Sequence, residues 1–206
     1  MHPGINGPKL KDKPAIIMAG SGDVITHQEL NELSNQGAQL FRSLGLKPGD
    51  SMAFMMENHK LFFPIAFAAW RSGLKYTAIS WRLQANEVEY IVKDCGAKVF
   101  ITSNFLEDSA KDLASSLEGV HKFMLDGESG DFKSFENAIK SMPIEPIEDE
   151  CQGAAMLYSS GTTGKPKGVS REINLSPLPY DSADDDLGLT RVCLLYTSDA
   201  ADEMRR

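Results

Sequence analysis

The sequence predicts an α/β fold in which a mostly parallel sheet is flanked by helices. Short apolar runs alternate with helix-like segments along most of the chain, which is the order typical of parallel α/β proteins. A capping box marks the first long helix, because Thr26 precedes a helical apolar pattern and Glu29 follows three residues later. The run "SMAFMM" at residues 51–56 has the continuous apolar character of a buried strand.

The N-terminal third of the chain is expected to open with a loose segment over residues 1–14, which is rich in Gly, Pro and Lys. Two short strands, "AIIMAG" and "DVIT", follow on either side of a turn. The helix that starts at Thr26 is expected to end at Gly45, since glycine adopts the left-handed cap conformation. A second helix is expected to begin at Asn58, and Pro64 beyond its first turn is expected to remove a hydrogen bond or bend it.

The alternation of strands and helices continues to a last clear strand, "GAAMLY" at residues 153–158, which leads directly into a glycine-rich loop. In parallel sheets ligands bind at the carboxyl ends of the strands, so this loop lies where a binding site is expected. We expect one domain over residues 15–191. The remaining expected elements are strands at 76–79, 98–102 and 122–125 and helices at 85–95, 107–117 and 132–141.

Composition narrows the classes of function. The chain has 206 residues with 42% hydrophobic residues, enough for one sizeable domain, and a net charge of −8, which weighs against a basic nucleic-acid-binding surface. Acidic residues form two clusters that we interpret as solvated linkers on either side of the loop. These clusters are Glu145, Glu148, Asp149 and Glu150, and Asp181, Asp184, Asp185 and Asp186.

Metal, disulfide and membrane signals are weak. The three cysteines and four histidines are dispersed, so neither a zinc site nor a disulfide framework is predicted. The longest apolar run, "LFFPIAFAAW" at 61–70, is half of the roughly 20 residues that a membrane span needs, and it indicates a buried helix. No signal-peptide pattern opens the sequence, so a cytoplasmic location without a membrane span is expected.

The glycine-rich loop, "SSGTTGKPKG" at residues 159–168, has the composition of a phosphate cradle. Glycines permit backbone N–H groups to converge on an anion, while hydroxyls and lysines add directed hydrogen bonds and charge. It is not a Walker A loop, because Gly164 and Lys165 are followed by Pro166 where that motif requires Ser or Thr. The hydroxyls belong to Ser159, Ser160, Thr162 and Thr163, and Gly161, Gly164, Gly168, Lys165 and Lys167 complete the loop.

The segment "MLYSSGTTGKPKG" resembles, over its full length, the AMP-binding signature of the adenylate-forming enzymes, and the resemblance extends over residues 15–169. It is most similar to fatty-acyl-CoA synthetases. The resemblance implies that a carboxylic acid, a fatty acid in this type, attacks the α-phosphate of Mg²⁺-bound ATP, and that coenzyme A then accepts the acyl group. It also implies that the loop contacts the β- and γ-phosphates through Ser159, Ser160, Gly161, Thr162, Thr163, Gly164 and Lys167.

The same resemblance implies that part of the machinery is missing. The family's magnesium-binding glutamate, ribose-binding aspartate and catalytic lysine have no counterpart after Ser170, so we assign no catalytic or metal-binding residue and expect an inactive N-terminal fragment. Residues 193–203, "CLLYTSDAADE", resemble a translated sequencing adapter, and we expect 192–206 to be a non-native tail. Two alternatives remain: a non-catalytic nucleotide- or anion-binding fragment, and another adenylate-forming ligase such as a peptide-synthetase adenylation domain.

Overall fold

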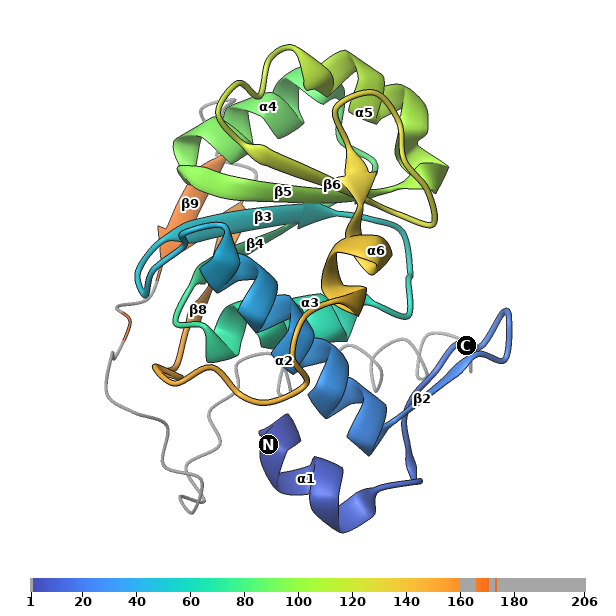
Figure 1. Ribbon diagram of the computed structural model, residues 1–206. Coiled ribbons are helices and arrows are strands. Elements are labelled where there is room, and N and C mark those ends of the chain that lie inside the picture. Colours follow the sequence, from blue (N-terminus) through green and yellow to red (C-terminus); the bar gives the residue numbers. More distant parts are fainter. Residues whose placement is uncertain (1, 160–165, 171–172, 174–206) are drawn as a thin grey trace, which may run out of the picture.

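The fold is organised around a seven-stranded sheet (Figure 1) in a computed structural model that describes residues 2–159, 166–170 and 173. The strand order is β7-β6-β5-β3-β4-β8-β9, and all neighbouring pairs are parallel except β8 with β9. This confirms the predicted α/β class. The strands are β3 (Ser51–Met55), β4 (Lys75–Ile79), β5 (Ala97–Ser103), β6 (His121–Leu125), β7 (Lys133–Ser134), β8 (Ala154–Ser159) and β9 (Lys167–Ser170), and a separate antiparallel hairpin joins β1 (Pro14–Ile17) to β2 (Val24–Thr26).

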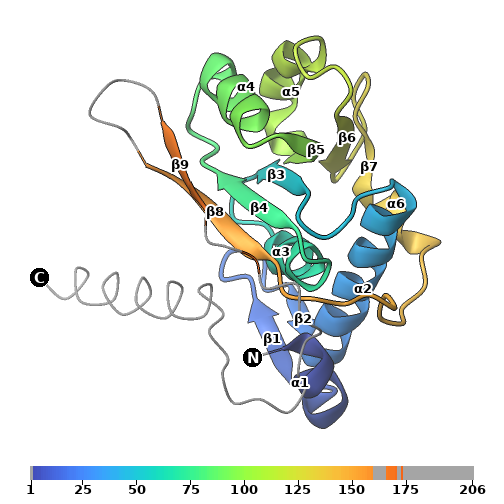
Figure 2. The same ribbon diagram turned by 90° about the vertical axis from the view of Figure 1, so that its left-hand side faces the viewer.

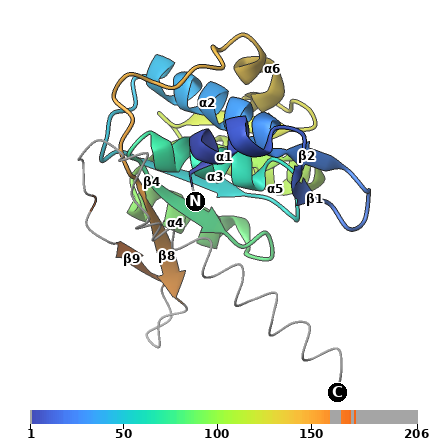
Figure 3. The same cartoon turned by 90° about the horizontal axis from the view of Figure 1, so that it is seen from below.

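Helices cover both faces of the sheet, as Figures 1 and 3 show. Alternate residues of β3 point into two separate cores: Met52 and Phe54 pack on the α2 and α3 side, and Ala53 and Met55 pack on the α4 and α5 side. A strand buried on both faces has no polar face, which explains its continuous apolar run. The helices are α1 (Pro3–Leu10), α2 (His27–Ser43), α3 (Phe62–Arg71), α4 (Ala85–Asp94), α5 (Glu107–Ala114) and α6 (Phe135–Lys140), with a 3₁₀ turn at Asn104–Leu106.

The predicted ends of α2 are confirmed. The Glu29 N–H donates to Thr26 Oγ1 at 3.2 Å, and the Thr26 N–H donates to Glu29 Oε2 at 2.8 Å, so both halves of the capping box are present. Gly45 has φ of +82°, the left-handed conformation expected of a glycine that follows a helix. Local chemistry therefore sets both ends of this helix.

The structure differs from the loose segment expected over residues 1–14, because α1 forms there. His2 Nδ1 accepts a hydrogen bond from the Gly4 N–H at 2.9 Å and caps the helix. α1 lies directly on α2, where a Cβ placed on Gly7 would be 2.9 Å from Asn31 Cβ. Packing on α2 therefore stabilises a segment whose composition gives little helical signal.

The expected start of the second helix at Asn58 is wrong. α3 begins at Phe62, so Pro64 lies in the first turn, where a backbone N–H would have no partner within the helix. Pro64 therefore removes no helical hydrogen bond. Residues 65–71 of α3 are all buried, as predicted for a core helix, and none of the helices in the described part of the chain is long and apolar enough to span a membrane.

The first acidic cluster is not simply a solvated linker. Arg42 Nε donates to Asp149 Oδ1 at 2.9 Å, and Glu150 is buried beside the Arg71 guanidinium. Side-chain amides of α2 also hold the segment that precedes this pair, for example the Asn35 amide on the Ile144 carbonyl at 2.6 Å. The second acidic cluster and the expected tail at 192–206 lie outside the described residues.

The segment that enters β8 makes a very close backbone contact with the end of α3. The Gly153 N–H donates to the Trp70 carbonyl at 2.6 Å, and the Ala154 N–H donates to the Leu74 carbonyl at 3.0 Å. A Cβ placed on Gly153 would overlap the Leu74 carbonyl oxygen and lie 2.8 Å from the Leu74 nitrogen. Only glycine permits this approach, because the obstructing atoms belong to the backbone and have no free rotation.

The outer end of β8 is held by α4. The Tyr158 hydroxyl donates to Asp94 Oδ2 at 2.5 Å. Partial burial and this hydrogen bond both raise the pKa of Tyr158 well above its ordinary value of 10.0. β8 is therefore attached at two points, at its first residues beside α3 and near its end beside α4.

We predict that Gly153→Ala lowers the free energy of unfolding by about 3 kcal/mol, because the added methyl group collides with backbone at Leu74. Urea denaturation measures this change. Gly20→Ala is the matched control, since a Cβ at Gly20 meets nothing within 4 Å. Equal effects of the two substitutions would contradict the proposed collision.

We also predict that Tyr158→Phe lowers the free energy of unfolding by about 1 kcal/mol at pH 8, because the hydrogen bond to Asp94 is lost. The pKa of Tyr158 is raised on folding, so its contribution is fully present below pH 10. It falls above pH 10, because the unfolded tyrosine then ionises while the folded hydroxyl keeps its proton. Unfolding measured at pH 8 and pH 11 should therefore show a smaller difference between the two proteins at pH 11. A difference that does not depend on pH would argue against this hydrogen bond.

Candidate functional site

β8 and β9 form an antiparallel ribbon on the β4 side of the sheet (Figure 2), and they carry the first and last residues of the glycine-rich segment. β8 pairs with β4 only where Ala154 and Ala155 lie opposite Lys75 and Tyr76. Its other pairs are with β9, from Met156 to Ser159. β9 is not predicted from the sequence, because its four residues include Gly168 and Ser170 and give almost no strand signal.

Two of the seven predicted phosphate-contacting residues lie in the described part of the chain. Ser159 ends β8, Lys167 begins β9, and the two are direct cross-strand partners. Ser160, Gly161, Thr162, Thr163 and Gly164 lie outside the described residues. The structure therefore brings together the two ends of the predicted site, at the carboxyl end of a strand as expected.

The side chains of Ser159 and Lys167 have donors that can bind an anion. The side chains of Ser159 and Lys167 are both exposed, and Lys167 has no ion-pair partner within residues 2–159 and 166–170. A hydroxyl donor and an ammonium donor on neighbouring strands can both bond to one phosphate group. The arrangement can therefore hold a polyphosphate through hydrogen bonds and charge, without a covalent step.

Gly168 has a steric role beside this pair. A Cβ at Gly168 would overlap Met156 Cε and lie 2.9 Å from Tyr158 Cζ. Tyr158 lies directly opposite Gly168 in the ribbon, so the missing side chain leaves room for the ring. Sequence reasoning treated Gly168 only as a backbone pivot and did not single out Tyr158, whose aromatic character at the end of an apolar strand gives no specific signal.

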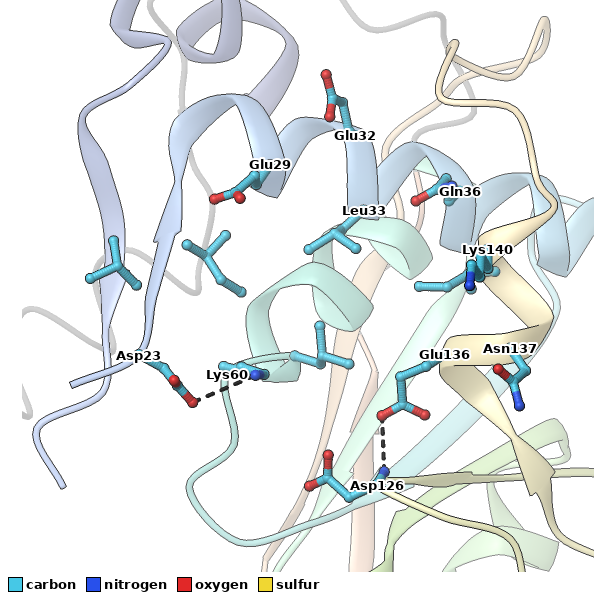
Figure 4. Close-up of a pocket in the computed structure, with 14 residues that line it drawn as sticks. Asp23, Glu29, Glu32, Leu33, Gln36, Lys60, Asp126, Glu136, Asn137 and Lys140 are labelled. Carbon is cyan, nitrogen blue, oxygen red and sulfur yellow. Dashed lines mark hydrogen bonds and ion pairs between the residues drawn. The ribbon is translucent and has the colours of Figure 1, made fainter. Parts of the chain in front are cut away.

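A cavity of about 670 Å³ lies away from the ribbon, between the β1-β2 hairpin, α2 and α6 (Figure 4). Its lining includes five carboxylates and two lysines, a balance that disfavours a polyphosphate. Several of these groups already have partners: Lys60 Nζ lies 3.5 Å from Asp23 Oδ2, and Glu136 Oε1 accepts from the Asp126 N–H at 2.9 Å. We therefore do not assign phosphate binding to this cavity. The carboxylates are Asp23, Glu29, Glu32, Asp126 and Glu136, and the lysines are Lys60 and Lys140.

Metal binding finds no support in the part of the chain that the structure describes. No group of three or more His, Cys, Asp or Glu side chains comes together there. The described residues of the ribbon nearest the loop, Ser159 and Lys167, supply a hydroxyl and a cation, whereas Mg²⁺ prefers carboxylate and phosphate oxygens. We therefore assign no Mg²⁺ ligand to these residues.

Comparison with known proteins adds three similarities. The chain is 31% identical over 159 residues to the fatty acid–(acyl-carrier-protein) ligase ScoC of Streptomyces coeruleorubidus, a match that covers 76% of this chain and 29% of that protein. It is 35% identical over 155 residues to a plipastatin synthase protein of Bacillus subtilis, covering 74% of this chain and 4% of that protein. A fatty acyl CoA synthetase structure from Mycobacterium tuberculosis superposes with a TM-score of 0.70 and 24% identity, over 82% of this chain and 33% of that chain.

The family match covers most of the sequence. Residues 6–174 fit the model of the AMP-binding enzymes, a span that includes the whole sheet and the glycine-rich loop. The chain spans about three-tenths of the length of the curated ligase that it matches over 159 residues. The loop composition, its position after β8 and the family match agree, and the chain belongs to the AMP-binding enzyme family of adenylate-forming ligases.

Proposed function

We propose that the glycine-rich loop holds the β- and γ-phosphates of ATP, and that this chain forms the phosphate-binding part of a ligase that activates a carboxylic acid. The observation that carries the proposal is the cross-strand pairing of Ser159 with Lys167 at an exposed strand end. This pairing brings together a hydroxyl and an ammonium that has no ion-pair partner among the described residues. The proposed contacts come from Ser159, Ser160, Gly161, Thr162, Thr163, Gly164 and Lys167.

The proposed role of these residues is positioning and charge stabilisation. When a carboxylate oxygen attacks the α-phosphorus of ATP, the bond to the β-phosphate oxygen breaks and pyrophosphate leaves with an added negative charge. Lys167 and the loop N–H groups would neutralise this charge as it develops, which lowers the barrier without forming a bond to the protein. Mg²⁺, when bound to ATP, would supply further charge neutralisation.

The proposal also names the acyl acceptor and the carboxylic acid. We propose a thiol acceptor, coenzyme A, and a fatty acid substrate, because the resemblance over residues 15–169 is to fatty-acyl-CoA synthetases. The name of the ligase from Streptomyces coeruleorubidus gives an acyl-carrier protein as the acceptor. Such a protein also accepts an acyl group on a thiol, so its chemistry as acceptor is of the same kind. The 35% identity to a plipastatin synthase protein supports amino-acid activation, as in a peptide synthetase, as the alternative.

We predict that Lys167→Ala weakens ATP binding to the 206-residue protein about tenfold, which corresponds to about 1.4 kcal/mol for one charged hydrogen bond. Isothermal titration calorimetry with ATP and with tripolyphosphate measures the change. Lys140→Ala is the control, because Lys140 lines the acidic cavity and not the ribbon. A loss of affinity in Lys140→Ala but not in Lys167→Ala would place the phosphate in the other cavity.

We further predict that the 206-residue protein binds ATP but catalyses no ATP–pyrophosphate exchange, since it spans about three-tenths of the length of the matched ligase. The assay would offer a panel of fatty acids, aromatic acids and amino acids. Exchange with fatty acids alone would support the acyl-CoA synthetase assignment while overturning the expected inactivity. Exchange with amino acids alone would favour the peptide-synthetase alternative.

A further inference from the structure

We propose that Arg71 and Glu150 form a buried ion pair that positions strand β8 and, through it, the glycine-rich loop. Both are positioning residues, since neither lies in the ribbon that carries the loop. The inference rests on the proposed function only in its last step, from the position of the strand to the affinity for ATP. Its first step, from the ion pair to the strand, stands on the described contacts alone.

Several parts of the fold meet at Arg71. Its side chain is fully buried at the end of α3, and its Nε donates to Glu150 Oε1. Its Nη1 donates to Ser34 Oγ at 2.8 Å and lies 3.3 Å from the Asn31 carbonyl, so it also bonds to α2. A planar guanidinium has donors in fixed directions, so these bonds define where Glu150 lies relative to both helices.

After Glu150 the chain follows the end of α3 into β8. The Cys151 N–H donates to the Arg71 carbonyl at 3.1 Å, so the segment continues along the end of α3. The close contact at Gly153 follows, and β8 begins at the next residue. Arg42 adds a second ion pair one residue earlier, with Asp149 at 2.9 Å, and its Nη2 donates to the Ser72 carbonyl at 2.9 Å. These successive contacts therefore fix the path of residues 149–153 up to the start of β8.

The ladder that joins β8 to the sheet is short. The strand has two residue pairs with β4, and its remaining pairs are with β9. Near its end the Tyr158 hydroxyl bonds to Asp94 of α4. From Ala154 to Ser159 the strand extends about 17 Å, at roughly 3.3 Å per residue. A tilt of about 5° at its start, opposed near its end by the Tyr158–Asp94 hydrogen bond, would shift Ser159 by about 1.5 Å. Misplacements of about 1 Å are enough to impair a binding or reacting geometry.

The energetics of buried ion pairs distinguish positioning from simple stabilisation. Replacing such a pair with two apolar residues is often neutral for stability or even stabilising, whereas removing one partner leaves a buried charge uncompensated. An apolar pair has no directional bonds, so it can restore stability without restoring position. The double substitution Arg71→Met with Glu150→Leu therefore separates the two roles.

The experiment compares four forms of the 206-residue protein: the unaltered chain, Glu150→Gln, the double variant and Lys122→Met. Lys122 is the control because it pairs with Asp131 at 3.5 Å, on the β6 side of the sheet and away from β8. Hydrogen exchange is measured by mass spectrometry for peptides over residues 154–159 and over β5. ATP affinity is measured by calorimetry at a temperature where every form is folded, and melting temperatures are recorded in parallel.

We expect about tenfold faster exchange over residues 154–159 in Glu150→Gln and in the double variant, with β5 unchanged, and a similar loss of ATP affinity. The double variant should have a melting temperature close to that of the unaltered protein. Lys122→Met should match the unaltered protein in exchange, ATP affinity and melting temperature. If Glu150→Gln does not fold, the double variant alone decides the question.

Two results would overturn the proposal. One is that the double variant exchanges over residues 154–159 at the same rate as the unaltered protein. The other is that the double variant exchanges faster there but binds ATP with unchanged affinity. A protein whose unaltered form binds no ATP, yet shows faster exchange over 154–159 in the variants, would support the positioning of β8. The same result would reject the proposed phosphate binding, so the two failures are distinguishable.

Discussion

The backbone contact between Gly153 and the turn at Leu74 is the constraint on which the ribbon depends. It lets the chain pass within hydrogen-bonding distance of the end of α3 and turn into β8 beside β4. Upstream of that point the chain is held by α2 and α3. Downstream, the ribbon has a short ladder to β4 and the Tyr158 hydrogen bond to Asp94 of α4. The position of the first residues of β8 is thus set largely by contacts made before the strand begins.

The parts of the fold that sequence reasoning predicted are those set by local chemistry and by one-dimensional patterns. The capping box of α2, the glycine at its end and the double-sided burial of β3 each depend on residues near in sequence or on a simple apolar run. The carboxyl end of β8 was predicted as the site for the same reason, because a strand followed by glycines and hydroxyls is a local pattern.

The parts that sequence reasoning missed depend on partners far away in the chain. Helix α1 is stabilised by α2, and Glu150 is buried by an arginine 79 residues earlier. An acidic residue in a proline-rich stretch indicates solvent exposure unless its partner is known, and a single arginine that ends an apolar helix does not identify that partner. Strand β9 is defined by its pairing with β8 and not by its own residues.

The contact between Gly168 and the Tyr158 ring bears on how mutational scans of this segment are interpreted. A Cβ at Gly168 would overlap Met156 Cε and crowd the Tyr158 ring, so these two side chains would have to move. Loss of function at this position would therefore report a shape requirement, even though the residue belongs to the signature segment. Ligand contacts in such a scan are better assigned from side-chain deletions at Ser159 and Lys167, whose exposed groups leave the ribbon's packing intact.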